Sequence, residues 1–461
     1  MKFDLLPFVL KIINKFEKAG FEIYIVGGAV RDLLSKRFVD DWDFTTDATP
    51  EEILKLYPDA FYDNKFGTVG LAHESSPNPY EITTFRREYG YSDKRRPDKV
   101  EWGKSLEEDL ERRDFTINAM ALKIQNQKPI TKNQSQNIEV EAELIDIYDG
   151  HKDLNDKLIR AVGEPKKRFS EDALRMMRAV RIAAELGFMI DHDTFEAIKM
   201  NTNLINKIAK ERVRDELLKI LESNNPYEGV MILRNSGLMQ EILPEMEKTF
   251  GVEQKSPGRH HIYDVGTHSL LSLKNSKSED AIVRLAILIH DIGKPQTFKK
   301  LKNGVITFYN HEVVGARMAK AIARRLRFSK KQRDKLWRLV RYHQFTVNEH
   351  QTDSAIRRFI RNVTKQYVPD MIDLRVADRL GGGARETSWR LEDFKKRLIE
   401  VQKQPFTVHD LKVSGNDVMK VLRLRSGPKV GEVLEKLYEE VVEKKTDNTK
   451  KALMKRLKEI K

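Results

Sequence analysis

The strongest constraint on the fold of this chain is a change of sequence pattern near residue 150. Before it, short apolar runs rich in β-branched and aromatic residues alternate with turn residues, which predicts strands; these runs cover residues 21–28, 68–73, 80–85 and 117–124. After it, such runs almost vanish and apolar residues recur at helical spacing. Strands followed by helices predict an α+β fold, with a small mixed sheet in the first third of the chain and helices in the rest.

The length of the chain, 461 residues, exceeds what one hydrophobic core usually organises, so we expect several domains. The pattern predicts an α+β domain over residues 1–150, then a helical neck (151–225), a helical body (226–390) and a helical tail (391–461). Within the first domain, the polar, Asn- and Gln-rich residues 125–140 are expected to form an exposed loop or hairpin.

The net charge and the residue composition limit the binding partners and the kinds of site that this chain can have. Lys and Arg number 84 against 70 Asp and Glu, and this net charge of +14 favours a polyanionic partner such as nucleic acid. The absence of cysteine excludes disulfides, thiolate metal sites and cysteine nucleophiles. No run approaches the roughly 18 apolar residues of a membrane span, and the N-terminal segment lacks the apolar core of a signal peptide. We expect a cytoplasmic protein without a membrane partner, and leave its oligomeric state open.

The first candidate site follows the strand predicted over residues 21–28. Gly27 and Gly28 separate this strand from the helical segment "AVRDLLSK". Glycines allow backbone amides to approach a ligand closely, and the start of a helix offers unpaired N–H groups to an anion. Arg31 lies one turn into that helix and is placed to contact a phosphate. A purely structural turn is the alternative for this motif taken alone.

Two carboxylates follow the glycine turn. Asp41 and Asp43 flank Trp42, and alternate residues of a strand share a face, so both acids point to one side and the tryptophan to the other. Two such acids repel each other unless a cation lies between them. Mg²⁺ suits carboxylates and substrate phosphates, and a third acid, for which Glu81 is the candidate, would complete a two-metal site. Solvated acids at a strand end are the alternative.

An ordered set of motifs resembles a known family. The motifs are "GGAVRD", Asp-x-Asp, "ITTFR", "RRDFTINAMA" (112–121), "IDIYDGHKDL" (145–154) and "RFSEDALRMMRAVRIAAELGF" (168–188). Together, over residues 22–222, they resemble the class II tRNA nucleotidyltransferases and bacterial poly(A) polymerases. The resemblance implies a Mg²⁺-dependent nucleotidyltransferase head with tRNA, CTP and ATP as partners. It also implies attack of a 3′-hydroxyl on the α-phosphate, with release of pyrophosphate.

The resemblance gives roles to the residues of the head. In the family the glycine turn and its arginine bind the triphosphate, which here points to Gly27, Gly28 and Arg31. The Asp-x-Asp acids bind Mg²⁺, so the catalytic candidates are Asp41, Asp43 and Glu81.

A helix predicted over residues 170–187 carries further candidates. Ser170 is its expected N-cap, within a capping box, and a glycine its expected stop. Asp172 and Arg175 are three residues apart and are therefore expected on one face of this helix. In the family the matching pair reads the Watson–Crick edge of the incoming base.

Three more arginines belong to the nucleotide site that the resemblance implies. Arg113 matches a position that helps to hold the nucleotide, with an ion pair to Asp114 as the alternative. Arg178 and Arg181 continue the face of the predicted helix at a spacing of three and suit phosphates. For these two, a surface ladder of salt bridges is the alternative.

Histidines in the second half of the chain form a separate pattern. The dipeptide His290-Asp291 ends an apolar helical run, and imidazole with carboxylate favours transition metals. The ordered set resembles the HD-domain phosphohydrolases of the dinuclear type and implies a Mn, Fe, Ni or Zn site. Its members are His268, His290, Asp291, His311, His343 and Asp378. A satisfied polar pair in the core is the alternative, and whether this copy is active or structural stays open.

The full interpretation is addition of CCA to the 3′ end of tRNA. The loop over residues 87–105 supports it, because family members that add only CC tend to have a shortened loop at this place. Addition of A alone and poly(A) synthesis remain alternatives within the family, and HD-domain phosphohydrolysis is the alternative from another class. The C-terminal helical segment (406–441) is expected to grip tRNA through its shape and phosphates.

Overall fold

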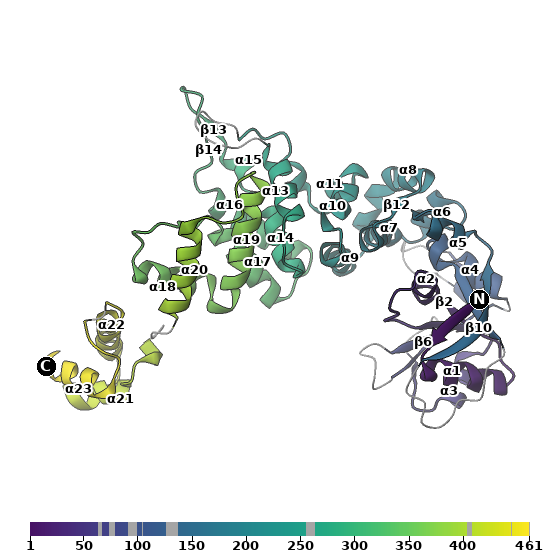
Figure 1. Ribbon diagram of the computed structural model, residues 1–461, viewed down its shortest axis with the longest axis horizontal. Helices are drawn as coiled ribbons and strands as arrows, with labels where there is room; N and C mark the ends of the chain where they lie inside the picture. The colour runs from purple at the N-terminus through teal and green to yellow at the C-terminus, as the bar shows by residue number, and fades with distance from the viewer. Residues whose placement is uncertain are drawn as a thin grey trace. The chain divides into compact units, whose positions relative to one another are not determined.

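Figure 1 shows a computed structural model of the chain. It describes residues 1–62, 67–72, 79–90, 99–103, 105–125, 137–254, 263–402, 408–443 and 445–460. Contacts divide the chain into two compact units: Met1–Glu247 with Arg325–Arg327, and Lys248–Arg324 with Phe328–Lys461. We describe each unit by itself.

One eight-stranded mixed sheet forms the first part of unit 1. Its strand order is β1-β10-β9-β2-β3-β6-β5-β4, and β3 and β6 are its only parallel neighbours among the described residues. The strands are β1 (Lys2–Leu5), β2 (Ile23–Val26), β3 (Asp43–Thr46), β4 (Phe61–Tyr62), β5 (Thr68–Leu71), β6 (Tyr80–Thr84), β9 (Met120–Gln125) and β10 (Ile138–Asp146). The sheet confirms the predicted α+β fold.

Helices cover this sheet. They are α1 (Pro7–Lys18), α2 (Gly28–Leu34), α3 (Pro50–Leu56) and α4 (Leu106–Glu111). In Figure 1, α2 lies above the sheet and α1 and α3 lie below it. All four residues of β2 are buried, as expected for a central strand that is covered on both faces. The glycine turn and the Asp-x-Asp motif therefore stand at the ends of rigid, neighbouring strands.

Two loops predicted in the head lie between paired strands. β9 and β10 are antiparallel neighbours, so they flank the segment predicted as an exposed loop, of which residues 126–136 lie outside the described part. β7 (Arg86–Tyr89) pairs antiparallel with β8 (Lys99–Trp102). These two strands flank residues 91–98, the centre of the loop at 87–105, which also lie outside the described part.

The rest of unit 1 is helical. Its helices are α5 (Gly150–Asn155), α6 (Pro165–Glu171), α7 (Leu174–Leu186), α8 (His192–Asn201), α9 (Lys210–Glu222), α10 (Pro226–Asn235), α11 (Leu238–Ile242) and α12 (Pro244–Glu247). Because α10 packs against α7 and α9, the contacts of this unit continue past residue 225, the expected end of the neck, to Glu247.

The helix expected over residues 170–187 is interrupted. Ser170 is not its N-cap but lies inside α6, where its hydroxyl donates to the Lys167 carbonyl at 2.8 Å. The chain leaves helical geometry at Asp172, with φ −130° and ψ 103°, and α7 begins two residues later. The predicted stop is correct, since Gly187 ends α7 in the left-handed conformation, φ 71°.

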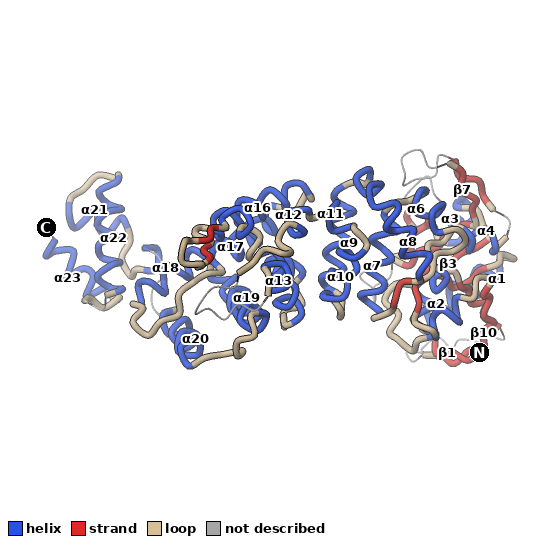
Figure 2. Tube along the Cα trace, turned by 90° about the horizontal axis from the view of Figure 1, so that it is seen from above, coloured by secondary structure: helices blue, strands red, loops and turns tan. Residues whose placement is uncertain are grey.

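Unit 2 consists mainly of helices. They are α13 (Val265–Lys274), α14 (Ala281–Ile289), α15 (Lys294–Thr297), α16 (His311–Arg325), α17 (Lys330–Tyr342), α18 (Asp353–Val363), α19 (Val368–Gly381), α20 (Trp389–Val401), α21 (Gly415–Leu422), α22 (Pro428–Val442) and α23 (Lys450–Ile460). Every residue of α14 is buried, and α13, α17 and α19 pack around it. Figure 2 shows the helical character of this unit, in which strands are short.

Two cores lie within unit 2. In the first, Phe394 of α20 packs on Phe345 and Phe359, with ring centroids 5.4 Å from each. α20 therefore belongs with the body helices, although the tail was expected to begin at residue 391. A second core is built by α21, α22 and α23 and includes Leu437 and Leu453.

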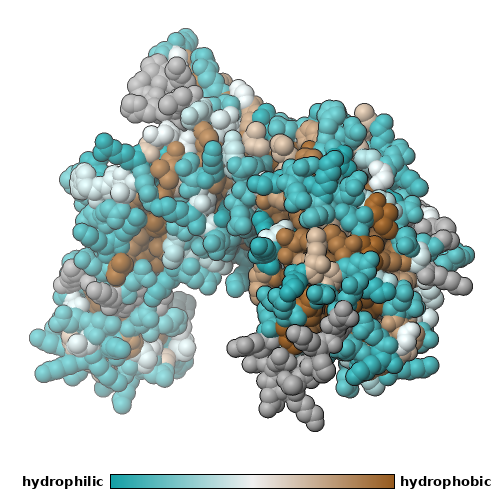
Figure 3. Space-filling view, turned by 45° about the vertical axis from the view of Figure 1, so that its right-hand side comes forward, coloured by the Kyte–Doolittle hydropathy of each residue, from teal (hydrophilic) through white to brown (hydrophobic). Residues whose placement is uncertain are grey.

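The surface drawn in Figure 3 is mostly hydrophilic, with apolar side chains in smaller areas. Within the described part of the chain, no helix has the length and apolar character that crossing a membrane requires.

Candidate functional site

The glycine turn in unit 1 requires glycine for two reasons. Gly27 precedes α2 with φ 72° and ψ −140°, a conformation that side-chain-bearing residues rarely adopt. A Cβ at this position would also lie 3.1 Å from Oδ2 of Asp43 and 3.1 Å from Nη1 of Arg113. The missing side chain of Gly27 thus lets an acid and an arginine approach the turn together.

The Asp-x-Asp acids lie beside this turn. Asp43 is the first residue of β3, and Asp41 is exposed just before it. Trp42 is buried at 5% exposure, in agreement with its expected role in packing. Burial raises the pKa of Asp43; Arg113 opposes this rise and Asp41 adds to it, which shows that both groups are close enough to act on Asp43.

The third predicted acid, Glu81, lies in β6. The parallel register of β3 and β6 pairs Glu81 with Asp43, which puts both side chains on one face of the sheet. The three acids are nevertheless not gathered to metal-ligand distances: among the described residues, the groups of three ligand atoms within 4.8 Å of one another lie in unit 2. Asp41 and Asp43 suit a divalent ion that also takes ligands from a substrate phosphate.

Arg31 belongs to a polar network that joins the turn to the "RRDFTINAMA" segment. Its Nε and Nη2 donate to the two carboxylate oxygens of Asp32 at 2.9 and 2.8 Å. Its Nη1 donates to Oδ1 of Asn118 at 3.1 Å, and Asn118 donates in turn to Asp114 at 3.2 Å. These contacts fix the guanidinium of Arg31 near the first turn of α2.

The partner of Arg113 is a buried acid that the sequence did not single out. Its Nη2 lies 3.0 Å from Oδ2 of Asp109, which is fully buried. Burial alone would raise the pKa of Asp109, but Arg112 and Arg113 outweigh it and lower the pKa below its usual value. The expected alternative, an ion pair of Arg113 with Asp114, is not what the structure shows.

Asp114 instead pairs with Arg178 of α7. The Nη2 and Oδ2 atoms of this pair are 2.6 Å apart, and Nε also donates to Oδ2 at 2.7 Å. Burial would raise the pKa of Asp114, but Arg178 outweighs burial and holds the pKa well below its usual range. This bidentate ion pair ties the sheet domain to the helix that follows it.

The expectation that Asp172 and Arg175 share a helix face is wrong. Asp172 lies in the break between α6 and α7, where its Oδ1 accepts from the backbone N–H of Leu174 at 2.9 Å. Burial raises its pKa, and Arg175 is close enough to oppose this rise. Arg175 is buried at 8% exposure, and its Nη1 donates to Glu171 at 3.0 Å. The two side chains are neighbours, but they are presented by different elements.

Arg181 is held within the helices. Its Nε lies 2.9 Å from Glu216 of α9, and its Nη1 lies 3.2 Å from Glu185. Because Glu216 is buried, this contact joins α7 to α9. Arg181 is therefore held in salt bridges, which was the alternative to a role in binding phosphates.

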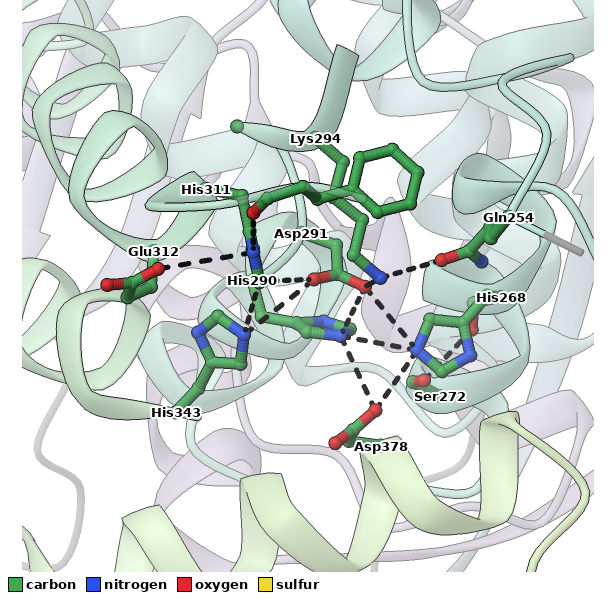
Figure 4. Close-up of polar contacts among 12 residues, drawn as sticks. Gln254, His268, Ser272, His290, Asp291, Lys294, His311, Glu312, His343 and Asp378 are labelled. Carbon is green, nitrogen blue, oxygen red and sulfur yellow. Dashed lines mark hydrogen bonds and ion pairs between the residues drawn. The ribbon is translucent and has the colours of Figure 1, made fainter. Parts of the chain in front are cut away.

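The six predicted ligands in unit 2 converge on one site, shown in Figure 4. They form two groups, in each of which one ligand atom per residue lies within 4.8 Å of the others: His268, His290 and Asp378, and Asp291, His311 and His343. They come from α13, the end of α14, the start of α16, the end of α17, and α19. Segments far apart in sequence are thus gathered around the buried end of α14.

The histidines are oriented by the backbone. In three of them, Nδ1 lies 2.7 to 2.8 Å from the carbonyl three residues earlier: His290 from Ile287, His311 from Phe308 and His343 from Val340. An Nδ1–H that donates to a carbonyl leaves the Nε2 lone pair free for a metal. The Nε2 atoms of His311 and His343 are 3.3 Å apart, and two lone pairs at this distance repel unless a proton or a cation lies between them. The donor set therefore fits a metal ion.

Asp291 lies between the two groups of ligands. Its Oδ2 is 3.2 Å from Nε2 of His290, and its Oδ1 is 3.3 Å from Nε2 of His311. With one oxygen toward each group, this carboxylate has the position of a bridge between two metal ions. Lys294 also approaches, with its Nζ 2.6 Å from Oδ2 of Asp291.

The electrostatics of this centre favour positive charge. Burial would lower the pKa of His290, but Asp291 and Asp378 outweigh it and raise the pKa to about 10. Burial would raise the pKa of Asp291, but His290 and Lys294 outweigh it and hold the pKa well below its usual range. Burial lowers the pKa of His343. A metal ion binds the neutral form of an imidazole, so His290 would have to lose a proton when metal binds. Metal binding at this centre is therefore expected to release protons.

The centre opens into a cavity of about 580 Å³. Lys294, Arg375 and Tyr309 line this cavity beside the six ligands. Positive groups next to a metal centre suit a phosphate ester.

Several site residues were not predicted from the sequence. Lys294 follows Asp291 by three residues, so a basic residue one turn after the His-Asp dipeptide was an available signal. Asn118 lies inside the quoted "RRDFTINAMA" motif, and Asp109 is four residues before Arg113 on α4. Their roles follow from contacts in the folded chain: Asn118 accepts a hydrogen bond from Arg31, and Asp109 pairs with Arg113.

Known proteins are similar to all parts of this molecule. The poly A polymerase head domain matches residues 23–160, the RNA and SrmB-binding site of polymerase A matches 187–250, and tRNA nucleotidyltransferase domain 2 matches 314–457. The CCA-adding enzyme of Ligilactobacillus salivarius is 46% identical over 222 residues, 48% of this chain and 50% of the relative. That of Limosilactobacillus reuteri (strain DSM 20016) is 44% identical over 245 residues, 52% of this chain and 56% of the relative. The chain thus spans about half the length of the curated relatives it matches.

Solved structures resemble the chain over nearly its whole length. The CCA-adding enzyme of Bacillus stearothermophilus in complex with CTP has a TM-score of 0.69 at 27% identity, over 98% of this chain and 96% of that one. The Thermotoga maritima CCA-adding enzyme complexed with tRNA has a TM-score of 0.57 at 20% identity, over 99% and 97% of the two chains, and supports the fold alone.

A mixed sheet that carries a glycine turn beside paired acids, followed by helices, defines a nucleotidyltransferase head with a helical extension. In its head and in two later segments the chain is similar to the tRNA nucleotidyltransferases and bacterial poly(A) polymerases.

Proposed function

We propose that the chain adds CCA to the 3′ end of tRNA, using CTP and ATP. The observation that carries the proposal is the close approach of Asp43 and Arg113 to the turn at Gly27, which puts a carboxylate and a guanidinium beside the backbone amides at the start of α2. The similarity to CCA-adding enzymes, one of them in complex with CTP, supports the substrates. A cytoplasmic location, expected from the sequence, agrees with a tRNA substrate.

The reaction joins two nucleotides. The 3′-hydroxyl oxygen of the tRNA forms a bond to the α-phosphorus, the bond to the pyrophosphate oxygen breaks, and the hydroxyl proton is lost. Asp41 and Asp43 would hold Mg²⁺, with Glu81 as the third acid, and Mg²⁺ supplies charge neutralisation at the phosphates when bound. Arg31 and Arg113 add positive charge beside the triphosphate, and the backbone amides of the glycine turn donate to it.

Nucleotide selection falls to the junction of α6 and α7. Asp172 offers acceptors there, and its neighbour Arg175 offers a planar set of donors. For Arg175 to read a base, its guanidinium exchanges the contact with Glu171 for the base edge. Arg178 stays paired with Asp114 and holds α7 against the sheet domain, with its half-exposed side chain beside the substrate phosphates.

The test is incubation of three tRNAs with CTP and ATP separately. The tRNAs lack CCA, end in C, or end in CC. We expect CTP alone to extend the first two and ATP alone to extend the third by one nucleotide. Extension of the third tRNA only would identify an enzyme that adds A alone, and long A tails on any RNA would identify a poly(A) polymerase.

We propose a second activity, metal-dependent hydrolysis of phosphate esters, for the histidine centre of unit 2. The observation that favours it is the position of Asp291 between two groups of ligands, beside a cavity lined by Lys294 and Arg375. In the reaction a water oxygen bonds to phosphorus, the ester P–O bond breaks, and the leaving hydroxyl takes up a proton. The six ligands would hold two Mn, Fe, Ni or Zn ions, which supply Lewis acidity when bound. Lys294 and Arg375 bind the phosphate oxygens.

This second activity is tested with adenosine 3′-monophosphate and each of the four metals in turn. We expect release of inorganic phosphate by the full chain and its loss in Asp291→Asn. If the chain binds metal but releases no phosphate with any of the four metals, the centre has a structural role and the proposed hydrolysis is contradicted.

A further inference from the structure

A second cavity of unit 2, about 450 Å³ in volume, has one lining residue in common with the cavity at the histidine centre. The two cavities share the side chain of Arg375, which lines both. The segment that leaves α17 also runs from one to the other: His343 is a ligand, Gln344 lines the metal cavity and Phe345 lines the second cavity. On α19, Asp378 belongs to the first cavity and Arg379 to the second.

The walls of this second cavity have the chemistry of a nucleotide site. Trp389 stands at the start of α20 and exposes 64% of its surface, although a tryptophan of this size normally packs. Arg390 lies over its ring, with the guanidinium carbon 5.2 Å from the ring centroid. An exposed indole beside arginines is a surface on which a nucleobase stacks.

Positive charge accompanies the tryptophan. Arg379 donates hydrogen bonds to the main-chain carbonyls of Arg385 and Thr387, at 3.1 and 3.4 Å, and these neutral partners do not offset its charge. Arg375 packs over the ring of Phe345 at 5.6 Å and lies 3.3 Å from Asp378. A guanidinium that links the metal ligands to the second cavity is placed for a phosphate that joins two nucleotides.

We propose that this second cavity, lined by Phe345, Arg375, Arg379 and Trp389, binds the penultimate nucleotide of a ribonucleotide chain whose terminal phosphate lies at the histidine centre. The inference rests on the phosphohydrolase activity proposed for that centre and specifies its substrate. The substrate is a single-stranded RNA end of at least two nucleotides. The penultimate base stacks on Trp389, and the phosphate between the two nucleotides lies near Arg375 and Arg379.

The test compares two substrates that differ by one nucleotide, ApAp and adenosine 3′-monophosphate, each with a terminal 3′-phosphate. A tenfold preference corresponds to about 1.4 kcal/mol, which lies in the lower part of the usual range for stacking of one base. We therefore expect kcat/KM of the full, metal-loaded chain to be about tenfold higher for ApAp, with the gain in KM. Trp389→Ala should remove this preference and Trp389→Phe should restore most of it. Ile399→Ala, an exposed apolar residue of the same helix outside the cavity, is the matched control and should retain the preference.

Equal kcat/KM values for the two substrates in the unmodified chain would overturn the inference while leaving the phosphohydrolase activity intact. If neither substrate is hydrolysed, the phosphohydrolase activity fails, and equilibrium dialysis of radiolabelled ApAp with the Mn²⁺-loaded chain decides the inference separately. Binding that Trp389→Ala weakens several-fold relative to Ile399→Ala supports the cavity as a nucleotide site. Binding that is the same in both variants contradicts it.

Discussion

The two candidate sites of this molecule differ in how much of each is assembled before a ligand arrives. In unit 2, six ligands already stand in two groups, and three histidines are oriented by backbone carbonyls. In unit 1, Asp43 and Glu81 are register partners on neighbouring strands and Asp41 lies just before β3, but the three acids are not gathered to metal-ligand distances. A buried histidine centre completes its coordination from the protein, whereas a Mg²⁺ site of two acids draws ligands from substrate phosphates. If the proposed functions hold, unit 2 would keep a resident metal, whereas in unit 1 the metal would arrive with the nucleotide.

The largest expected effect is the loss of nucleotide addition when the site of unit 1 is altered. Asp43→Ala should lower nucleotide addition to tRNA by on the order of a thousandfold or more, because it removes a carboxylate that we propose holds Mg²⁺ at the reacting phosphate. Binding of tRNA, measured by filter retention, should largely survive. Asp40→Ala, at an exposed acid three residues earlier, is the matched control and should keep its activity. Full activity of Asp43→Ala would contradict the proposed nucleotidyltransferase site in the head.

The second effect concerns the resident metal. Asp291→Asn should lower metal retained after dialysis from about two ions per chain to fewer than one, since one carboxylate oxygen of Asp291 faces each of the two groups that would hold the metal. Elemental analysis of the purified protein measures it, with Asp334→Asn, an exposed acid of α17, as the control. The same variant should still add nucleotides to tRNA. Loss of nucleotide addition with the metal would show that the two sites are not independent.

The third effect concerns stability of unit 1. Asp114→Asn should lower the free energy of unfolding by about 2 kcal/mol, less than for a fully buried pair because Arg178 is 38% exposed. The pKa of Asp114 is held below its usual value, so its contribution is present above the usual aspartate range and is lost as the pH falls through the lowered pKa. Urea unfolding between pH 7 and acid pH measures both points. Unchanged stability at pH 7, or a loss equal to that of the exposed Asp156→Asn, would show that the pair is not needed.

The smallest effect concerns choice of base. Asp172→Asn should lower the preference for CTP over UTP by about tenfold, as expected when one polar contact to a base edge is altered. Total incorporation with CTP should fall by less than that. The exposed Asp193→Asn in α8 is the control. Single-nucleotide incorporation with each triphosphate gives the ratio, and an unaltered ratio would contradict the selecting role of Asp172.

Many residues of the two candidate sites could be predicted from the sequence. Alternation along a strand predicted a buried Trp42, and Trp42 is buried, although β3 begins only at Asp43. The ordered set of four histidines and two aspartates, through its resemblance to dinuclear HD domains, predicted the six residues that the structure gathers in unit 2.

Other features depend on contacts between elements. The break at Asp172 was not predicted, because the residues around it favour helix and the cap on Leu174 comes from the side chain itself. The alternative considered for Arg113 was an ion pair with its chain neighbour Asp114, yet its guanidinium pairs with the buried Asp109 of α4. The first and last strands of the sheet, β1 and β10, pair antiparallel with each other although they lie far apart in the sequence, so the sequence showed them weakly.

The central claim is that the head site builds CCA and then stops. The most direct measurement incubates a tRNA transcript lacking CCA with CTP and ATP together and resolves the products to single-nucleotide length over time. The account predicts growth by three nucleotides, C, C and A, and no further extension. Products that stop after two nucleotides, or A tails that continue to lengthen, would contradict it.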